Sequence, residues 1–298
     1  MRGILGSCNG MEVLSVLADV IDVLACPVCA AALVLADGVV SCGNGHAFDV
    51  AREGYVNLLG GRASRGTADT PAMVDARARF LAAGHYAPIA AATASALAVA
   101  LPSEVAGCLV DVGAGTGYHL AAALDALPDR VGLALDISKS AARRGARAHE
   151  RIGAAVCDTW SALPVRCGTA AAVLDIFAPR NAPEMSRVLA PGGVLLVVTP
   201  TARHLRELVS ALDLISVDER KDERLEQTLG TLFERSDSAE CEYRMSLERS
   251  DIEAIVAMGP SARHDTGADR ADRIRRIEGP VTVTASVKVA TYRRMSTQ

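Results

Sequence analysis

Between about residue 106 and residue 200 short apolar runs alternate with helical segments, and this alternation constrains the fold more than any other feature. Strands are expected at 108–112, 131–136, 154–157, 170–177 and 194–199, and helices from 117, over 140–150 and over 183–189. Strands that alternate with crossover helices pair in parallel and close as a doubly wound sheet. We therefore predict an α/β, Rossmann-like domain, with 202–258 mostly helical and a late strand over 281–291.

The rest of the chain divides into regions that differ in composition and in the pattern of apolar residues. We predict an N-terminal extension over 1–22, a small metal-binding module over 23–60, a helical connector over 61–105 and the α/β domain over 106–298. The 298 residues, half of them apolar, are enough to bury a core without disulfides. A net charge of −4 excludes a uniformly basic nucleic-acid coat but leaves room for a local basic face. The absence of an apolar run of membrane-spanning length and the scattered cysteines predict a cytoplasmic protein with reduced thiols and no membrane partner.

One cluster of cysteines has the spacing of a zinc site. Cys26, Cys29, Cys42 and His46 form the pattern C-x2-C-x12-C-x3-H, with a hairpin expected between the two pairs. Two thiolates two residues apart can bind one ion from a tight turn, and Zn²⁺ prefers such a tetrahedral set of sulfur and imidazole ligands. The pattern predicts a structural zinc site; the alternative is four unrelated side chains at accidental spacing.

A glycine loop follows the first strand of the α/β domain. Gly113, Gly115 and Gly117 form a GxGxG turn directly after the apolar run 108–112. Glycines there let a ligand approach the backbone at the carboxyl ends of the strands. A dinucleotide fingerprint has its third glycine one residue further along.

Carboxylates at three successive strand ends favour one cofactor over the other nucleotide ligands. Asp111 precedes the first glycine, where it would repel a pyrophosphate but suits the cationic amino-acid end of S-adenosylmethionine (SAM). Asp136 ends the next strand and is expected to accept the ribose hydroxyls, and Asp158 follows the third strand, where the adenine amino group is expected. The three acids favour SAM over NAD; the alternative is that Asp136 and Asp158 only cap helices or form turns.

With both sites considered, the chain resembles the RlmA-type 23S rRNA guanine-N1 methyltransferases, and most of all the branch that confers tylosin and mycinamicin resistance. The resemblance is carried by residues 26–59, 75–86, 177–181 and 258–261. It implies methylation of N1 of a guanine in the hairpin-35 loop of domain II of 23S rRNA. It also implies a homodimer, the same four zinc ligands, and contacts to SAM from Tyr86 and His204.

Three residues near the end of the strand 170–177 are candidates for the chemistry. Guanine N1 carries a proton and is a poor nucleophile until that proton leaves. We expect Asp175 to accept the proton, Phe177 to stack on the base, and Arg180 to neutralise charge at O6 or to bind a phosphate. The alternatives are a buried turn partner, a core residue and a surface residue, respectively.

Two arginine clusters are candidates for binding phosphates. The first, preferred because it borders the presumed cleft, consists of Arg62, Arg65, Arg77 and Arg79. The second consists of Arg143, Arg144, Arg147 and Arg151, on successive turns of the helix expected over 140–150. Either cluster can also be a solvent-exposed helix face with no ligand, which is the most common explanation for a run of charged residues on a helix.

Two other functions are compatible with parts of this pattern. One is a SAM-dependent methyltransferase for a small molecule, which the zinc module disfavours because small substrates rarely need one. The other is a non-enzymatic, zinc-containing RNA-binding module, which the intact glycine loop and its carboxylates disfavour.

Overall fold

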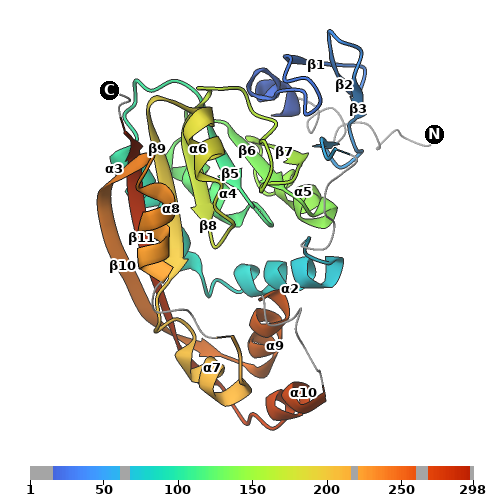
Figure 1. Ribbon diagram of the computed structural model, residues 1–298. Coiled ribbons are helices and arrows are strands. Elements are labelled where there is room, and N and C mark those ends of the chain that lie inside the picture. The colour runs from blue at the N-terminus through green and yellow to red at the C-terminus, as the bar shows by residue number, and fades with distance from the viewer. Residues whose placement is uncertain (1–15, 61–67, 216–220, 260–267, 296–298) are drawn as a thin grey trace, which may run out of the picture.

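The main sheet determines the architecture of the protein. The computed structural model describes residues 16–60, 68–215, 221–259 and 268–295 (Figure 1). Within these residues the main sheet consists of β4 (Tyr55–Asn57), β5 (Cys108–Val112), β6 (Gly132–Asp136), β7 (Ile152–Val156), β8 (Ala170–Ile176), β9 (Leu189–Pro200), β10 (Phe233–Leu247) and β11 (Val281–Arg294). Their order in space is β10-β11-β9-β8-β5-β6-β7-β4.

The sheet is doubly wound, as the sequence predicts. From β9 to β4 all neighbours are parallel, whereas β11 is antiparallel to both β9 and β10. The chain runs outward from β5 through β6 to β7, and then returns to the other side of β5 to form β8. The strand order therefore reverses between β5 and β8, and a crevice opens at the carboxyl ends of the strands at such a point.

Helices cover both faces of the sheet. The described helices are η1 (Ile21–Val23), α2 (Pro71–Ala82), α3 (Ala87–Ala100), α4 (Tyr118–Ala126), α5 (Lys139–Gly145), α6 (Ala182–Val188), α7 (Arg206–Leu212), α8 (Lys221–Leu229), α9 (Arg249–Met258) and α10 (Ala268–Arg275). Side chains of α3 and α4 belong to one core, and those of α6 and α8 to the core on the opposite face (Figure 1). None of the described helices is long and apolar enough to cross a membrane.

The N-terminal module is tied to the main sheet. It contains a small antiparallel sheet of β1 (Leu33–Ala36), β2 (Val39–Cys42) and β3 (Ala47–Asp49). The next strand, β4, pairs in parallel with β7 and so extends the main sheet. The segment before the module also packs against β7: Leu17 and Val20 are fully buried, and Gly153 leaves no room for a Cβ beside Val20. Of the N-terminal extension predicted over 1–22, residues 1–15 lie outside the described residues.

Two sequence predictions need correction. Residues 202–258 are not mostly helical, because β10 occupies 15 of them. Most side chains of β10 are polar and exposed, so its alternation is visible only toward its end, at Cys241, Tyr243, Met245 and Leu247. The helix expected over 140–150 ends at Gly145, and the residues after it form turns. The late strand is confirmed as β11.

Candidate functional site

Four ligand-type side chains converge in the N-terminal module. Nδ1 of His46 lies 3.6, 3.5 and 3.4 Å from the Sγ atoms of Cys26, Cys29 and Cys42, and Sγ of Cys29 lies 3.8 Å from Sγ of Cys42. A tetrahedral ion with Zn–S bonds of about 2.3 Å and a Zn–N bond of about 2.0 Å separates its ligands by about 3.8 Å for S–S and about 3.5 Å for S–N. The observed distances therefore fit a tetrahedral zinc ion. The four protein ligands fill its coordination shell and leave no position for a substrate.

Local backbone geometry explains why these ligands meet. The hairpin between the two pairs turns at Asp37 and Gly38, which both have positive φ (50° and 76°), as a type I′ turn requires. Asn44 donates a hydrogen bond of 3.3 Å to Sγ of Cys29, and this bond is the main cause that lowers the pKa of Cys29 to about 6. A thiolate is thus favoured at that position, as metal binding needs.

A second site lies where the strand order reverses. A cavity of about 520 Å³ opens at the carboxyl ends of β5, β6 and β8, and Leu81 of α2 and Met258 at the end of α9 also line it. Figure 1 shows α2 next to these strand ends, with α9 on its far side. Its wall includes the glycine loop at 113–116, Asp136, Tyr86, and the residues 176–179 that end β8. This volume is in the usual range for a cavity that holds a small-molecule ligand.

The glycine loop is shaped by close contacts that exclude side chains. Gly113 and Gly117 have φ values of 79° and 77°, in the left-handed region. A Cβ on Gly113 would lie 2.8 Å from Cβ of Ala178, and a Cβ on Gly117 would lie 2.9 Å from Cβ of Ala148. Glycine is required at both positions, because any side chain would push apart β5 and β8 or α4 and the segment after α5.

Asp136 holds the loop from the neighbouring strand. Its two carboxylate oxygens accept 2.8 Å hydrogen bonds from the backbone N–H groups of Gly115 and Ser138. Burial raises the pKa of Asp136, while these two hydrogen bonds oppose that shift. Each oxygen retains a lone pair, so the carboxylate on the cavity wall can still accept hydroxyl groups from a ligand.

Asp111 is a buried acid beside the site that is not itself part of the cavity wall. It is 2% exposed, on the strand that leads into the glycine loop. Burial, together with the negative charges of Asp136 and Asp175, raises its pKa to about 8. A cation bound next to such a carboxyl group would favour its ionised form. The contact of Asp111 to the amino-acid end of SAM stays a prediction.

Tyr86 lies on the cavity wall, and His204 is hydrogen-bonded to it from behind. The backbone N–H of Ser286 donates to Nδ1 of His204 at 3.1 Å, so the neutral ring carries its proton on Nε2. Nε2 therefore donates to the Tyr86 hydroxyl, 3.0 Å away, and the hydroxyl proton of Tyr86 is left for another acceptor. Burial raises the pKa of Tyr86 well above its usual value, which keeps it a neutral donor.

Phe177 stands at the mouth of the cavity in a strained conformation. Its φ is 56°, in the left-handed region that bulky residues avoid, and its side chain is 40% exposed. The rings of Tyr86 and His204 lie 6.1 and 6.0 Å from it, centroid to centroid. Strain of this kind persists where the surrounding structure holds it, which is typical of ligand sites.

Comparison with known proteins identifies the family. Residues 24–63 match the family model described as RlmA, N-terminal, a zinc ribbon. The chain is 50% identical over 291 residues to the "Putative 23S rRNA (guanine-N(1)-)-methyltransferase" of Micromonospora griseorubida, which covers 92% of this chain and 98% of that relative. It is 47% identical over 269 residues to the 23S rRNA (guanine(748)-N(1))-methyltransferase of Streptomyces fradiae, covering 90% and 96%.

The chain belongs to the RlmA-type 23S rRNA (guanine-N1)-methyltransferases. A solved SAM-dependent methyltransferase from Geobacter sulfurreducens covers 68% of this chain and 90% of its own, at 14% identity and a TM-score of 0.41, a likeness too low to bear on function. The cofactors of the methyltransferase are SAM and zinc, and the cavity and the Cys/His cluster fit them.

The predicted SAM ligands fall into two groups in this methyltransferase. Gly113, Gly115, Asp136 and Tyr86 lie on the cavity wall. Asp111 and Gly117 are not part of the wall, and His204 is bonded behind Tyr86. Asp158 is not part of the wall: its carboxylate accepts hydrogen bonds from the backbone of Trp160 and the hydroxyl of Ser161, both at 3.0 Å. Its contact to adenine stays a prediction, and Thr159 and Trp160 line the cavity beside it.

Of the three residues expected to carry the chemistry, only Phe177 lines the cavity. Asp175 is fully buried in β8. Since side chains alternate along a strand, it points to the opposite face from its neighbour Ile176, which does line the cavity. Arg180 is half-buried beyond Pro179 and does not reach the wall. The direct roles expected for Asp175 and Arg180 stay predictions.

Two cavity features were missed in the sequence. His119 lines the cavity, its buried Nδ1 has no hydrogen-bond partner within the described residues, and burial lowers its pKa to about 4. Its position two residues after the last loop glycine was the available signal. Asn181 donates to the backbone carbonyls of residues 159–161, at 2.9 to 3.3 Å, and so fixes the 60% exposed Trp160 beside the cavity.

The first arginine cluster is only partly placed. Arg62 and Arg65 lie outside the described residues. Arg77 lines the cavity but is held there by Asp69 at 2.5 Å and by the carbonyl of Met258 at 3.1 Å, so it joins α2 to α9. Arg79 is exposed on α2 and is not part of the cavity.

Removing zinc is expected to destabilise the N-terminal module, because the small sheet of β1–β3 has little core of its own. Cys29→Ser should lose the single zinc ion measured by atomic absorption and lower Tm by several degrees. Cys167→Ser, which removes an exposed cysteine outside the site, is the matched control. An unchanged Tm after complete loss of zinc would contradict a structural role for the metal.

Replacing Asp111 is expected to stabilise the fold at high pH and, at the same time, to weaken SAM binding. A carboxyl group whose pKa is raised to about 8 in the folded state stabilises the fold at low pH and loses this contribution as the pH rises through 8. Asp111→Asn should therefore have a higher free energy of unfolding than the wild type at pH 8.5, by on the order of a few kcal/mol, and nearly the same free energy of unfolding at pH 4.

The same variant should bind SAM at least about tenfold more weakly at pH 8.5, since one favourable charge interaction is lost. Asp125→Asn, whose side chain is 76% exposed, should change neither property. Calorimetric unfolding and SAM titration measure both effects. A wild type that is the more stable protein at pH 8.5 would disprove the argument.

Proposed function

We propose that this methyltransferase transfers the methyl group of SAM to N1 of a guanine in the hairpin-35 loop of 23S rRNA. The observation that carries the proposal is the exposed, strained Phe177 at the mouth of the cofactor cavity. The Streptomyces fradiae relative is named for guanine 748, and we assign the target to the equivalent position. Bases in RNA loops are recognised unstacked, on aromatic side chains, and Phe177 and Trp160 offer two such faces beside one cavity.

The geometry supports methyl transfer by positioning. When bound, SAM supplies a methyl group on a positively charged sulfur. Asp136 and the glycine loop would hold the adenosine part, and Asp111 favours positive charge behind the loop. Phe177 would hold the guanine ring against the cavity mouth, so that N1 and the methyl group meet in line. Positioning of this kind contributes several kcal/mol to the rate.

The N1 proton must leave during the reaction, and it would pass to solvent water at the open mouth of the cavity beside Phe177. Polar side chains of the cavity would assist its departure. The Tyr86 hydroxyl is a neutral donor that would stabilise charge at O6. His119 is neutral at pH 7 and can form one hydrogen bond from Nδ1 inside the cavity. A direct role for Asp175 or Arg180 requires RNA binding to bring the base to them.

The wider biological assignments belong to the same proposal. We propose the division into a zinc module at 23–60, a connector at 61–105 and a methyltransferase domain at 106–298, and a homodimeric enzyme that acts in the cytoplasm. N1-methylation in this loop would confer resistance to macrolide antibiotics, as the resemblance to the tylosin- and mycinamicin-resistance branch implies. Identity of 47–50% over nine-tenths of the chain to two 23S rRNA (guanine-N1)-methyltransferases supports the rRNA substrate from which these assignments start.

Primer extension across hairpin 35 tests the proposal, because N1-methylguanine cannot pair and stops reverse transcriptase. rRNA incubated with the wild type and SAM should give one strong stop at the target guanine. Phe177→Leu should bind SAM normally but transfer methyl groups about 10- to 100-fold more slowly, since base stacking is worth about 1–3 kcal/mol. Val99→Ala, at an exposed position of α3, is the control. Full activity of Phe177→Leu would refute the stacking role, and no stop with the wild type would refute the function.

A further inference from the structure

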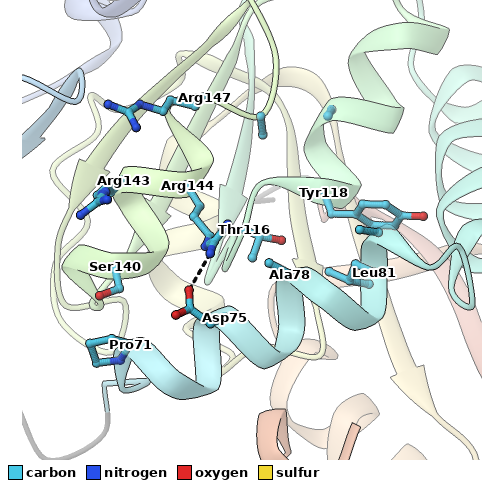
Figure 2. Close-up of a pocket in the computed structure, with 13 residues that line it drawn as sticks. Pro71, Asp75, Ala78, Leu81, Thr116, Tyr118, Ser140, Arg143, Arg144 and Arg147 are labelled. Carbon is cyan, nitrogen blue, oxygen red and sulfur yellow. Dashed lines mark hydrogen bonds and ion pairs between the residues drawn. The ribbon is translucent and has the colours of Figure 1, made fainter. Parts of the chain in front are cut away.

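A second hollow lies next to the cofactor cavity, between α2 and α5 (Figure 2). It has a volume of about 580 Å³. Leu81, Thr116 and Tyr118 line both this hollow and the cofactor cavity, so the two spaces adjoin each other. We call the hollow the α2–α5 groove. A strand of RNA with one base in the cavity has this groove as its immediate neighbour.

The groove is lined by three arginines and one acid. Arg144 points toward α2 and pairs with Asp75 at 2.5 Å, whereas Arg143 and Arg147 extend from the α5 segment away from that pair (Figure 2). Both are exposed, and neither forms an ion pair with any other described residue. The pKa of Glu53 is lowered mainly by its ion pair with Arg52, at 3.2 Å, and only to a minor extent by the charge of Arg143. The groove therefore carries excess positive charge.

Other arginines of this region are already used by the fold. Arg151 donates to the carbonyls of Leu124, Leu127, Pro128 and Arg130. Arg77 is held between Asp69 and Met258. Two cations that neither brace the backbone nor pair with acids contribute nothing evident to the fold, and their guanidinium groups remain available for an external anion.

We infer that the α2–α5 groove binds the phosphodiester backbone of the nucleotides that flank the target guanine. Arg143 and Arg147 would contact phosphates, and the Asp75–Arg144 pair would form the floor between the two helices. Tyr118, at the border with the cavity, presents an aromatic ring to the first flanking base. The inference rests on the proposed function, because it assumes that the target guanine lies in the cofactor cavity and that the RNA continues from there into the groove.

The double variant Arg143→Gln/Arg147→Gln tests this inference. Each phosphate contact contributes about 0.7–0.9 to the slope of log affinity against log salt. The variant should therefore reduce that slope by about 1.5 and raise KM for a hairpin-35 RNA about 20-fold at 150 mM salt, with kcat and SAM affinity unchanged. Arg235→Gln, at β10 on the opposite edge of the sheet, is the control and should change none of these values.

The outcomes separate this inference from the proposed function. If the wild type methylates the RNA but the double variant keeps its KM and salt slope, the groove does not bind phosphates and the inference is wrong. If the variant shows the rise in KM and the smaller salt slope with SAM affinity intact, the groove is the phosphate site. If the wild type methylates no rRNA, the proposed function fails, and the groove assignment fails with it.

Discussion

The close approach of Gly113 to Ala178, across the reversal between β5 and β8, is the contact on which the rest of the site depends. It brings the glycine loop and the Phe177 loop together at one edge of the sheet. A side chain on Gly113 would separate them, so the left-handed turn and the short distance to Ala178 are required together. Asp136 then fixes the loop from β6, and the wall of the cavity is complete before any ligand arrives.

Charged and aromatic side chains around this contact serve different ligands. On the inner side, buried Asp111 and Asp136 favour the positive charge of a sulfonium cofactor. On the outer side, Phe177 and Trp160 present exposed rings, which suit an unstacked base. The zinc module is linked to the same scaffold through β4, which pairs with β7 at the edge of the sheet. Loss of the metal would thus destabilise the edge of the methyltransferase domain as well.

The sequence was most informative where a residue type has one physical meaning. The spacing of Cys26, Cys29, Cys42 and His46 predicted the ligand cluster, and the glycine loop after an apolar strand predicted the cavity. Prediction failed where tertiary contacts determine the secondary structure or the surroundings of a side chain. The strand β10 carries polar, exposed side chains, and Asp175 is assigned to a face only by the alternation within β8. Nothing in the local sequence shows that Arg151 braces carbonyls while Arg147 faces solvent, because those carbonyls belong to residues 124–130.

Hydrogen exchange of the backbone amides, with and without SAM, tests the central claim most directly. If the cofactor occupies the reversal between β5 and β8, SAM should slow exchange at residues 113–117 and 176–178 and leave the distant hairpin β1–β2 unchanged. Slowed exchange confined to other parts of the chain, with the glycine loop exchanging at its original rate, would contradict the account.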